Sequence, residues 1–129
     1  LGDVYKRQVQ GRVVDRYGKH KHPELDTLII NNGIKIESSS RQSVHSVARG
    51  DVVFSGDFSG YGRVVIIDHK GGYFSIYGNL GEILVKEKQS VKAFEEIGKL
   101  KSLSPKETLY FEFRTGGKAV DPLAWLEKL

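Results

Sequence analysis

Residues 60–80, GYGRVVIIDHKGGYFSIYGNL, decide the fold of this 129-residue chain. Val64 to Ile67 form an apolar, β-branched run, and Tyr73 to Tyr77 alternate aromatic or apolar side chains with small or polar ones. Both patterns are typical of β-strands. Lys70-Gly71-Gly72 lies between them, and paired glycines favour a tight turn. The stretch therefore predicts a β-hairpin at the centre of an all-β domain.

Short strand-like runs recur on both sides of this hairpin. They lie at residues 9–14, 27–30, 34–37, 44–47, 51–55, 83–86, 94–100 and 108–113. Residues 16–23 read as a polar loop, and Asn31-Asn32-Gly33 predicts a tight turn with positive φ angles. Asp121 and Pro122 predict the start of a short C-terminal helix. About nine strands with frequent turn signals predict a two-sheet sandwich or open barrel of short antiparallel strands.

Composition narrows the classes of function. The chain has 39% hydrophobic residues, 28% charged residues and a net charge of +4, and it has no cysteine, which excludes disulfides and thiol chemistry. No apolar run approaches the ~18 residues that a membrane span needs, so we expect no membrane insertion by this fragment. The positive charge is spread along the chain without a stacking motif or recognition helix, so we expect no nucleic-acid partner.

The first eight residues differ in character from the rest. Leu1 to Gln8 lack the apolar core of a signal peptide, and Asp3 to Gln8 (DVYKRQ) match the translation of a transposon-end adapter. We therefore interpret residues 1–8 as a non-native leader and residues 9–129 as a single domain, with the true upstream sequence missing from the fragment.

Six blocks in the chain resemble a known family in order and spacing. They are GRVVDRYG with a later HP, NNGIKI, VARGDVVFSG, GYGRVVIIDHKGGYFSIYGNL, LYFEFR and GKAVDPLAWL. From Gly11 to the C-terminus the chain resembles the lysostaphin-like (LytM) peptidase domain. The resemblance implies a two-sheet β fold of the duplicated hybrid motif type, with a long groove floored by one sheet. Active members of the family use zinc there to cut peptidoglycan cross-bridge peptides.

The resemblance also assigns positions to the family's zinc ligands and assisting histidines. Asn31 and Lys35 stand at the His and Asp of the HxGxD block, and Asn79 stands at the histidine of the hairpin. Thr108 and Tyr110 stand at the two histidines of the HxH block. Zinc is normally held by imidazole, carboxylate or thiolate, and an ammonium beside the site repels a cation. We therefore expect a degenerate domain with no bound metal, no cofactor and no catalytic residue.

The substituted groove is the candidate binding site. In the family register, we expect it to be formed by Lys35, Tyr61, Val64, Tyr77, Asn79, Tyr110 and Arg114. Tyr and Arg are enriched at protein–protein hot spots, because they bury a large area and keep a polar tip. The alternative interpretation is that the tyrosines only fill the space that the metal and its ligands would take.

Within the family, the lost ligands and the block pattern look most like the EnvC-type murein hydrolase activators. That resemblance implies a monomeric periplasmic or cell-envelope protein, with a signal peptide upstream of the fragment. Its expected partner is a peptidoglycan (N-acetylmuramoyl-L-alanine) amidase that acts in daughter-cell separation, and it would bind the amidase through the groove. Two alternatives stay open, which are a module that binds peptidoglycan without a protein partner and a residual zinc endopeptidase.

Overall fold

The computed structural model describes residues 9–21 and 24–126. The predicted leader, residues 1–8, lies outside the described residues. The strands in chain order are β1 Arg12–Asp15, β2 Gly18–Lys21, β3 Leu28–Asn31, β4 Ile34–Ser39, β5 Ser43–His45, β6 Gly50–Phe58, β7 Gly62–Asp68, β8 Tyr73–Ile83, β9 Ser90–Val91, β10 Glu96–Leu100, β11 Lys106–Thr115 and β12 Lys118–Val120. The helix is α2, Pro122–Leu126. In the described part of the chain, no helix has the length and apolar character to cross a membrane.

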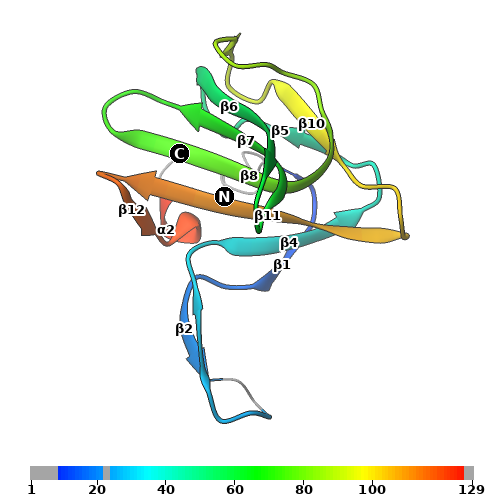
Figure 1. Ribbon diagram of the computed structural model, residues 1–129, viewed down its shortest axis with the longest axis vertical. Coiled ribbons are helices and arrows are strands. Elements are labelled where there is room, and N and C mark those ends of the chain that lie inside the picture. The colour runs from blue at the N-terminus through cyan, green and yellow to red at the C-terminus, as the bar shows by residue number, and fades with distance from the viewer. Residues whose placement is uncertain (1–8, 22–23, 127–129) are drawn as a thin grey trace.

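Hydrogen bonds join all strands except β2 and β3 into one ten-stranded sheet (Figure 1). Its main path runs β1-β4-β11-β8-β7-β6-β9, while β10 pairs with β5 and β8, and β12 pairs with β11. The strands β2 and β3 form a separate ribbon that projects from the sheet (Figure 1). Every pairing is antiparallel, so the predicted all-β class is confirmed.

The predicted central hairpin is confirmed as β7 and β8. Lys70, Gly71 and Gly72 all have positive φ angles, of 71°, 71° and 86°. The backbone N–H of His69 donates to the carbonyl oxygen of Tyr73 at 2.9 Å and closes the turn. The glycines supply the left-handed backbone that this turn needs.

One extra residue on β8 forms a β-bulge. Tyr77 pairs with Val65, but Leu80 pairs with Arg63, so three steps along β8 face two steps along β7. Asn79 takes up the extra step with a φ of 63°, and its N–H donates to the carbonyl oxygen of Tyr61 at 2.8 Å. The bulge reverses the alternation of side chains along β8, because Tyr77 and Leu80 both point into the core.

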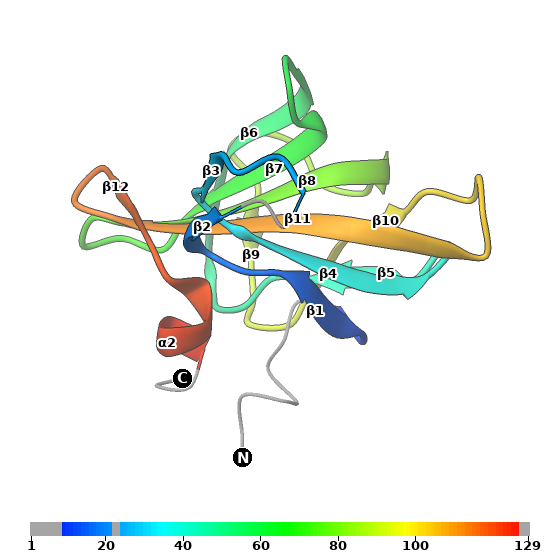
Figure 2. The same cartoon turned by 90° about the horizontal axis from the view of Figure 1, so that it is seen from below.

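The core lies on the side of β11 that faces helix α2 (Figure 2). Leu109 and Phe111 of β11 are fully buried there, on the face opposite Tyr110 and Glu112. Trp125 of α2 packs against this core. The backbone N–H of Leu123 donates to Asp121 Oδ1 at 3.0 Å, which confirms the predicted helix cap.

Two local predictions are wrong. Gly18 to Lys21 lie in the predicted polar loop but form strand β2, because they pair with β3. The side chains of β2 are polar, so the sequence has no alternation of apolar residues that would indicate a strand. Gly33 does not have a positive φ. A Cβ there would collide with the carbonyl oxygen of Phe111, so close backbone approach requires this glycine.

The strand predicted at residues 83–86 does not form a separate strand. Strand β8 continues to Ile83, and residues 84–86 have no regular structure. The predicted strands around 44–47 and 51–55 are present as β5 and β6. They do not pair with each other: β5 pairs with β10, and β6 pairs with β7 and β9.

Candidate functional site

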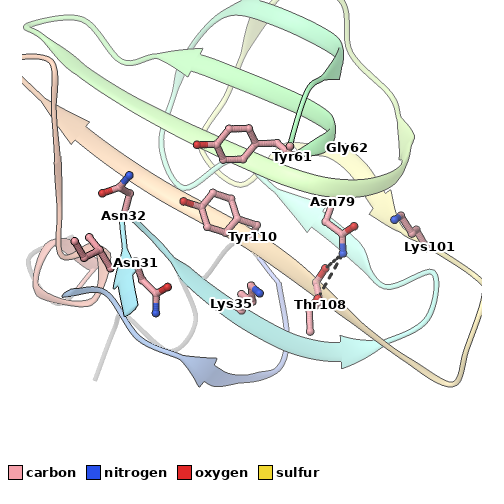
Figure 3. A pocket seen from close by; sticks show the side chains of 11 residues that line it. Asn31, Asn32, Lys35, Tyr61, Gly62, Asn79, Lys101, Thr108 and Tyr110 are labelled. Atoms are coloured by element: carbon pink, nitrogen blue, oxygen red, sulfur yellow. Dashed lines mark hydrogen bonds between the residues drawn. The ribbon is translucent and has the colours of Figure 1, made fainter. Parts of the chain in front are cut away.

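A groove of about 720 Å³ runs along the sheet face opposite the core. All five positions that the resemblance assigns to lost ligands and bases line it, as do Tyr61, Lys101 and residues of β3. The five are Asn31, Lys35, Asn79, Thr108 and Tyr110. Strands β3, β4, β8 and β11 carry them, so the antiparallel pairing brings together residues that are far apart in sequence (Figure 3).

A smaller apolar notch of about 200 Å³ adjoins this groove. Its lining is Phe58, Tyr61, Val64, Ile66, Ile76, Glu112 and Arg114. Tyr61 lines both the groove and the apolar notch. Val64 and Arg114 therefore lie on the predicted face, but in the apolar notch rather than in the groove.

Three aromatic rings form a continuous row across the two hollows. The ring centroids of Phe58 and Tyr61 are 5.7 Å apart, and those of Tyr61 and Tyr110 are 5.3 Å apart. In Figure 3 the two tyrosine side chains lie one above the other and their hydroxyls point the same way. The row presents aromatic area with polar tips, which suits recognition of a partner.

The carboxylate of Glu112 holds Tyr110, which lines the groove, by a hydrogen bond. Glu112 itself is only 1% exposed. The Tyr110 hydroxyl donates to Glu112 Oε1 at 2.7 Å, and Arg114 Nε donates to Glu112 Oε2 at 3.3 Å. Burial, together with the hydrogen bond and charge of Glu112, raises the pKa of Tyr110 well above its ordinary value. Tyr110 therefore stays protonated and acts as a hydrogen-bond donor.

Sequence reasoning missed Glu112. The available signal was a glutamate between Phe111 and Phe113, on the same face of the strand as Tyr110 and Arg114. A carboxylate on a half-buried face needs a partner there. The pair also gives Arg114 a structural task, which it would have even if the tyrosines only filled space.

The opposite end of the groove is polar. Asn79 Nδ2 donates to the carbonyl oxygen of Thr108 at 2.7 Å and reaches its Oγ1 at 3.4 Å. Lys35 and Lys101 lie on either side of this pair (Figure 3). Within residues 9–21 and 24–126, neither ammonium group has a hydrogen-bond or ion-pair partner.

Asn31 lines the groove, but its amide is engaged elsewhere. Its Nδ2 donates to Asp15 Oδ1 at 3.0 Å and to the carbonyl oxygen of Arg16 at 2.9 Å. These bonds tie the start of the β2–β3 ribbon to the end of β3. The residue at the former ligand position therefore holds the ribbon at the groove's edge.

The substituted donor set does not fit zinc. It consists of two amides, an ammonium, a threonine hydroxyl and a protonated phenol, whereas zinc sites use imidazole, thiolate and carboxylate. The described residues contain no group of three His, Cys, Asp or Glu side chains that could hold a metal ion. The carboxylate that is nearby, Glu112, already accepts from Tyr110 and Arg114.

Tyr77 does not line the groove, contrary to the prediction. It is 0% exposed, its ring lies 5.3 Å from that of Phe111, and its hydroxyl accepts from the Val47 N–H at 3.0 Å. The prediction placed Tyr77 in the groove from the family register. The bulge at Asn79 breaks the alternation of side chains along β8 and leaves Tyr77 on the core face.

A second polar chain runs from Tyr77 to the surface at His69. The Tyr77 hydroxyl lies 2.8 Å from Ser75 Oγ, which lies 2.7 Å from His69 Nε2, and His69 Nδ1 lies 2.8 Å from the Arg49 carbonyl oxygen. Because a carbonyl only accepts, Nδ1 carries the proton and Nε2 accepts from Ser75. Burial lowers the pKa of His69, so this neutral form is favoured.

Comparison with known proteins agrees with this architecture. The family model described as peptidase family M23 matches residues 29–122. Among solved structures, a zinc-containing peptidase from Vibrio cholerae matches with a TM-score of 0.77 and 26% identity, covering 90% of this chain and 38% of that one.

Two relatives have informative names. The chain is 36% identical over 125 residues to murein hydrolase activator NlpD of Escherichia coli (strain K12), covering 95% of this chain and 31% of that protein. It is 39% identical over 100 residues to outer membrane antigenic lipoprotein B of Haemophilus influenzae, covering 76% and 25% respectively. The chain thus spans about a third or less of these relatives. The predicted resemblance to murein hydrolase activators is confirmed, under the branch name NlpD instead of EnvC.

Proposed function

The chain belongs to peptidase family M23, and on that premise we propose that it is a non-catalytic activator of peptidoglycan amidases. One observation carries the proposal. The five residues that the resemblance assigns to ligand and base positions line one groove, and their side chains do not suit zinc but do suit binding. An activator of N-acetylmuramoyl-L-alanine amidases fits a domain that keeps the groove without its metal chemistry.

The groove has the makeup of a protein-binding surface. It has a volume of about 720 Å³, which supports a binding role over the alternative that the tyrosines only fill space. Tyr61 and Tyr110 supply rigid aromatic area, and the Glu112 network holds Tyr110 in place. Such preorganised aromatic residues reduce the entropy lost on binding. The name of the Escherichia coli relative, a murein hydrolase activator, supports the same conclusion.

Activation is proposed to occur by a shift of population in the amidase. The groove would bind a regulatory helix of the amidase more tightly when that helix has left the amidase's own active site. Binding can move the equilibrium only by the difference in affinity for the two states. The domain itself would act as a monomer in the bacterial periplasm or cell envelope, as the lipoprotein name of the Haemophilus relative suggests.

A peptidoglycan-binding module is the second candidate. The adjacent rings of Tyr61 and Tyr110, 5.3 Å apart, offer a face on which a sugar ring could pack. Pull-down with isolated sacculi tests this candidate, because it requires retention on sacculi without any added protein.

The activator proposal is tested by dye release from labelled sacculi with a cognate amidase. We expect the domain to accelerate release, and Tyr61→Ala to lose about tenfold or more of that stimulation, as for a hot-spot residue. Tyr73→Ala is the matched control, because Tyr73 lies at the far end of β8, beside Trp125. An amidase that runs equally fast with and without the domain would refute the proposal.

A further inference from the structure

Two lysines line the groove without an ion-pair partner among the described residues. The charged residues that line it are Lys35 and Lys101, and no carboxylate is among its described lining residues. Asp15 is the cross-strand neighbour of Lys35, and its carboxylate accepts from Asn31 Nδ2 at 3.0 Å. The nearest acid along β4, Glu37, is engaged with Arg12 at 3.4 Å and with Lys106 at 4.0 Å. Both groove ammonium groups are therefore available to an incoming anion.

Asn79, between the two lysines, is already hydrogen-bonded, whereas the Thr108 O–H donates in no hydrogen bond among the described residues. Asn79 donates to Thr108, and this pair lies between Lys35 and Lys101 (Figure 3). A carboxylate placed there could receive hydrogen bonds from both ammonium groups and from the Thr108 hydroxyl. Charge-assisted hydrogen bonds of this kind are stronger than neutral ones.

The apolar notch lies on the other side of the tyrosine row. Val64, Ile66 and Ile76 supply aliphatic surface, and Phe58 is 50% exposed at its edge. A volume of about 200 Å³ suits one aliphatic or aromatic side chain. The charged groups at the notch, Glu112 and Arg114, are paired with each other, so the notch offers shape and apolar area rather than free charge.

We infer that the groove and the apolar notch together bind one acidic, amphipathic segment of the partner protein. A carboxylate of the segment would lie between Lys35 and Lys101, its backbone would cross Tyr61 and Tyr110, and an apolar side chain would enter the notch. This inference rests on the proposed function, since it names the chemistry of the amidase segment that the domain captures. Two ammonium groups beside a notch for an apolar side chain favour a peptide over a polyphosphate chain, which would need a longer row of cations.

The test uses the domain and a synthetic probe, without an amidase. The probe is the capped hexapeptide Glu-Leu-Leu-Glu-Leu-Glu, which places Glu and Leu at several relative spacings. Amide signals of the ¹⁵N-labelled domain are followed by NMR during titration. We expect shifts at Lys35, Tyr61, Asn79 and Lys101, with binding at least fivefold weaker when every Glu of the peptide is replaced by Gln or every Leu by Ser.

Two lysine variants provide the matched comparison. Lys35→Gln combined with Lys101→Gln should weaken binding of the acidic peptide about tenfold or more, which corresponds to about 1.4 kcal/mol. Lys86→Gln combined with Lys118→Gln removes the same charge from exposed positions elsewhere and should leave binding unchanged. Equal weakening by both double variants would show only a general charge effect and would overturn the inference.

Further outcomes separate this inference from the proposed function. It is overturned if no groove signal shifts up to about 10 mM peptide, a range that captures weak binding, or if the Gln peptide binds equally well. Amidase stimulation that survives Lys35→Gln with Lys101→Gln would keep the activator function and overturn the acidic segment. Binding of an isolated peptidoglycan stem peptide in place of the hexapeptide would also overturn it and would favour the peptidoglycan-binding module.

Discussion

The two faces of strand β11 differ in the side chains they carry and in their surroundings. On the core face, Leu109 and Phe111 are fully buried apolar side chains that pack against neighbouring strands. On the groove face, Tyr110, Glu112 and Arg114 form a hydrogen-bonded polar network beside the groove. Alternation in a single strand thus separates the residues that stabilise the fold from those available for binding. Substitutions of groove residues outside the Glu112 network should therefore affect binding more than stability.

Two tyrosines on neighbouring strands make the contrast sharper. Tyr77 and Tyr110 each use the hydroxyl in a hydrogen bond, but Tyr77 is enclosed by the core while Tyr110 lines the groove. For each, burial raises the pKa of the phenol. The difference between them lies in what surrounds the ring, and it predicts opposite outcomes of truncation.

The largest effect is expected for Tyr77→Ala. Removal of a fully buried aromatic ring leaves a cavity and strands the N–H of Val47, so the free energy of unfolding should fall by about 3–5 kcal/mol. Urea denaturation followed by far-UV circular dichroism measures the loss. Tyr110→Ala, the matched control, should lose less than half as much. Similar losses for both variants would mean that the two faces do not differ as described.

An intermediate effect is expected for the Glu112–Arg114 pair. Arg114→Met leaves the buried carboxylate of Glu112 with Tyr110 as its remaining side-chain partner, and should lower the free energy of unfolding by about 2 kcal/mol. The estimate is kept below that for a fully buried pair, because the Arg114 side chain is 33% exposed.

A double-mutant cycle checks the physical cause. Glu112→Leu combined with Arg114→Met should cost less than the sum of the two single changes, by about 1 kcal/mol. Additive losses would indicate that the Glu112 and Arg114 side chains do not stabilise each other.

The smallest effect is a pH dependence that comes from His69 on the core side. Burial holds the pKa of folded His69 below the ordinary 6.5, so the unfolded chain binds a proton more readily. The stability due to the neutral ring is present above pH 6.5 and is lost as pH falls through the folded pKa. The free energy of unfolding should therefore decrease from about pH 7.5 to about pH 5.

His69→Gln tests this assignment, because glutamine cannot titrate. The variant should have a shallower pH dependence than the wild type over the same range, measured by urea denaturation at each pH. An unchanged slope would mean that other groups, such as the carboxylates at the surface, cause the pH dependence.

The sequence predicted the hairpin, the all-β class and the meeting of five substituted positions, because these follow from side-chain period and block order. It placed Tyr77 wrongly because a one-residue bulge at Asn79 has no strong sequence signal; asparagine tolerates the left-handed backbone without requiring it. Strand β2 was missed for a different reason. Its exposed polar side chains read as loop, and the partner strand β3 supplies the hydrogen bonds that make it a strand.

The sequence pattern alone could not predict the hydrogen-bond network around Glu112. The alternation of Leu109, Tyr110 and Phe111 separates the faces of the strand, but the burial of Glu112 depends on the close approach of Gly33 and the tyrosine ring. Tertiary contacts of this kind decide whether a polar residue on a strand is solvated or enclosed.

The hydrogen bond from Tyr110 to Glu112 also makes the loss of the family's chemistry hard to reverse. Restoring histidine at position 110 would remove the phenol that satisfies a buried carboxylate, and restoring aspartate at position 35 would add another negative charge to the same face. Each of these single substitutions toward a metal site therefore carries an energetic penalty in this fold. Tyr110 and Glu112 are thus mutually dependent, because substitution of either one removes a side-chain hydrogen-bond partner of the other.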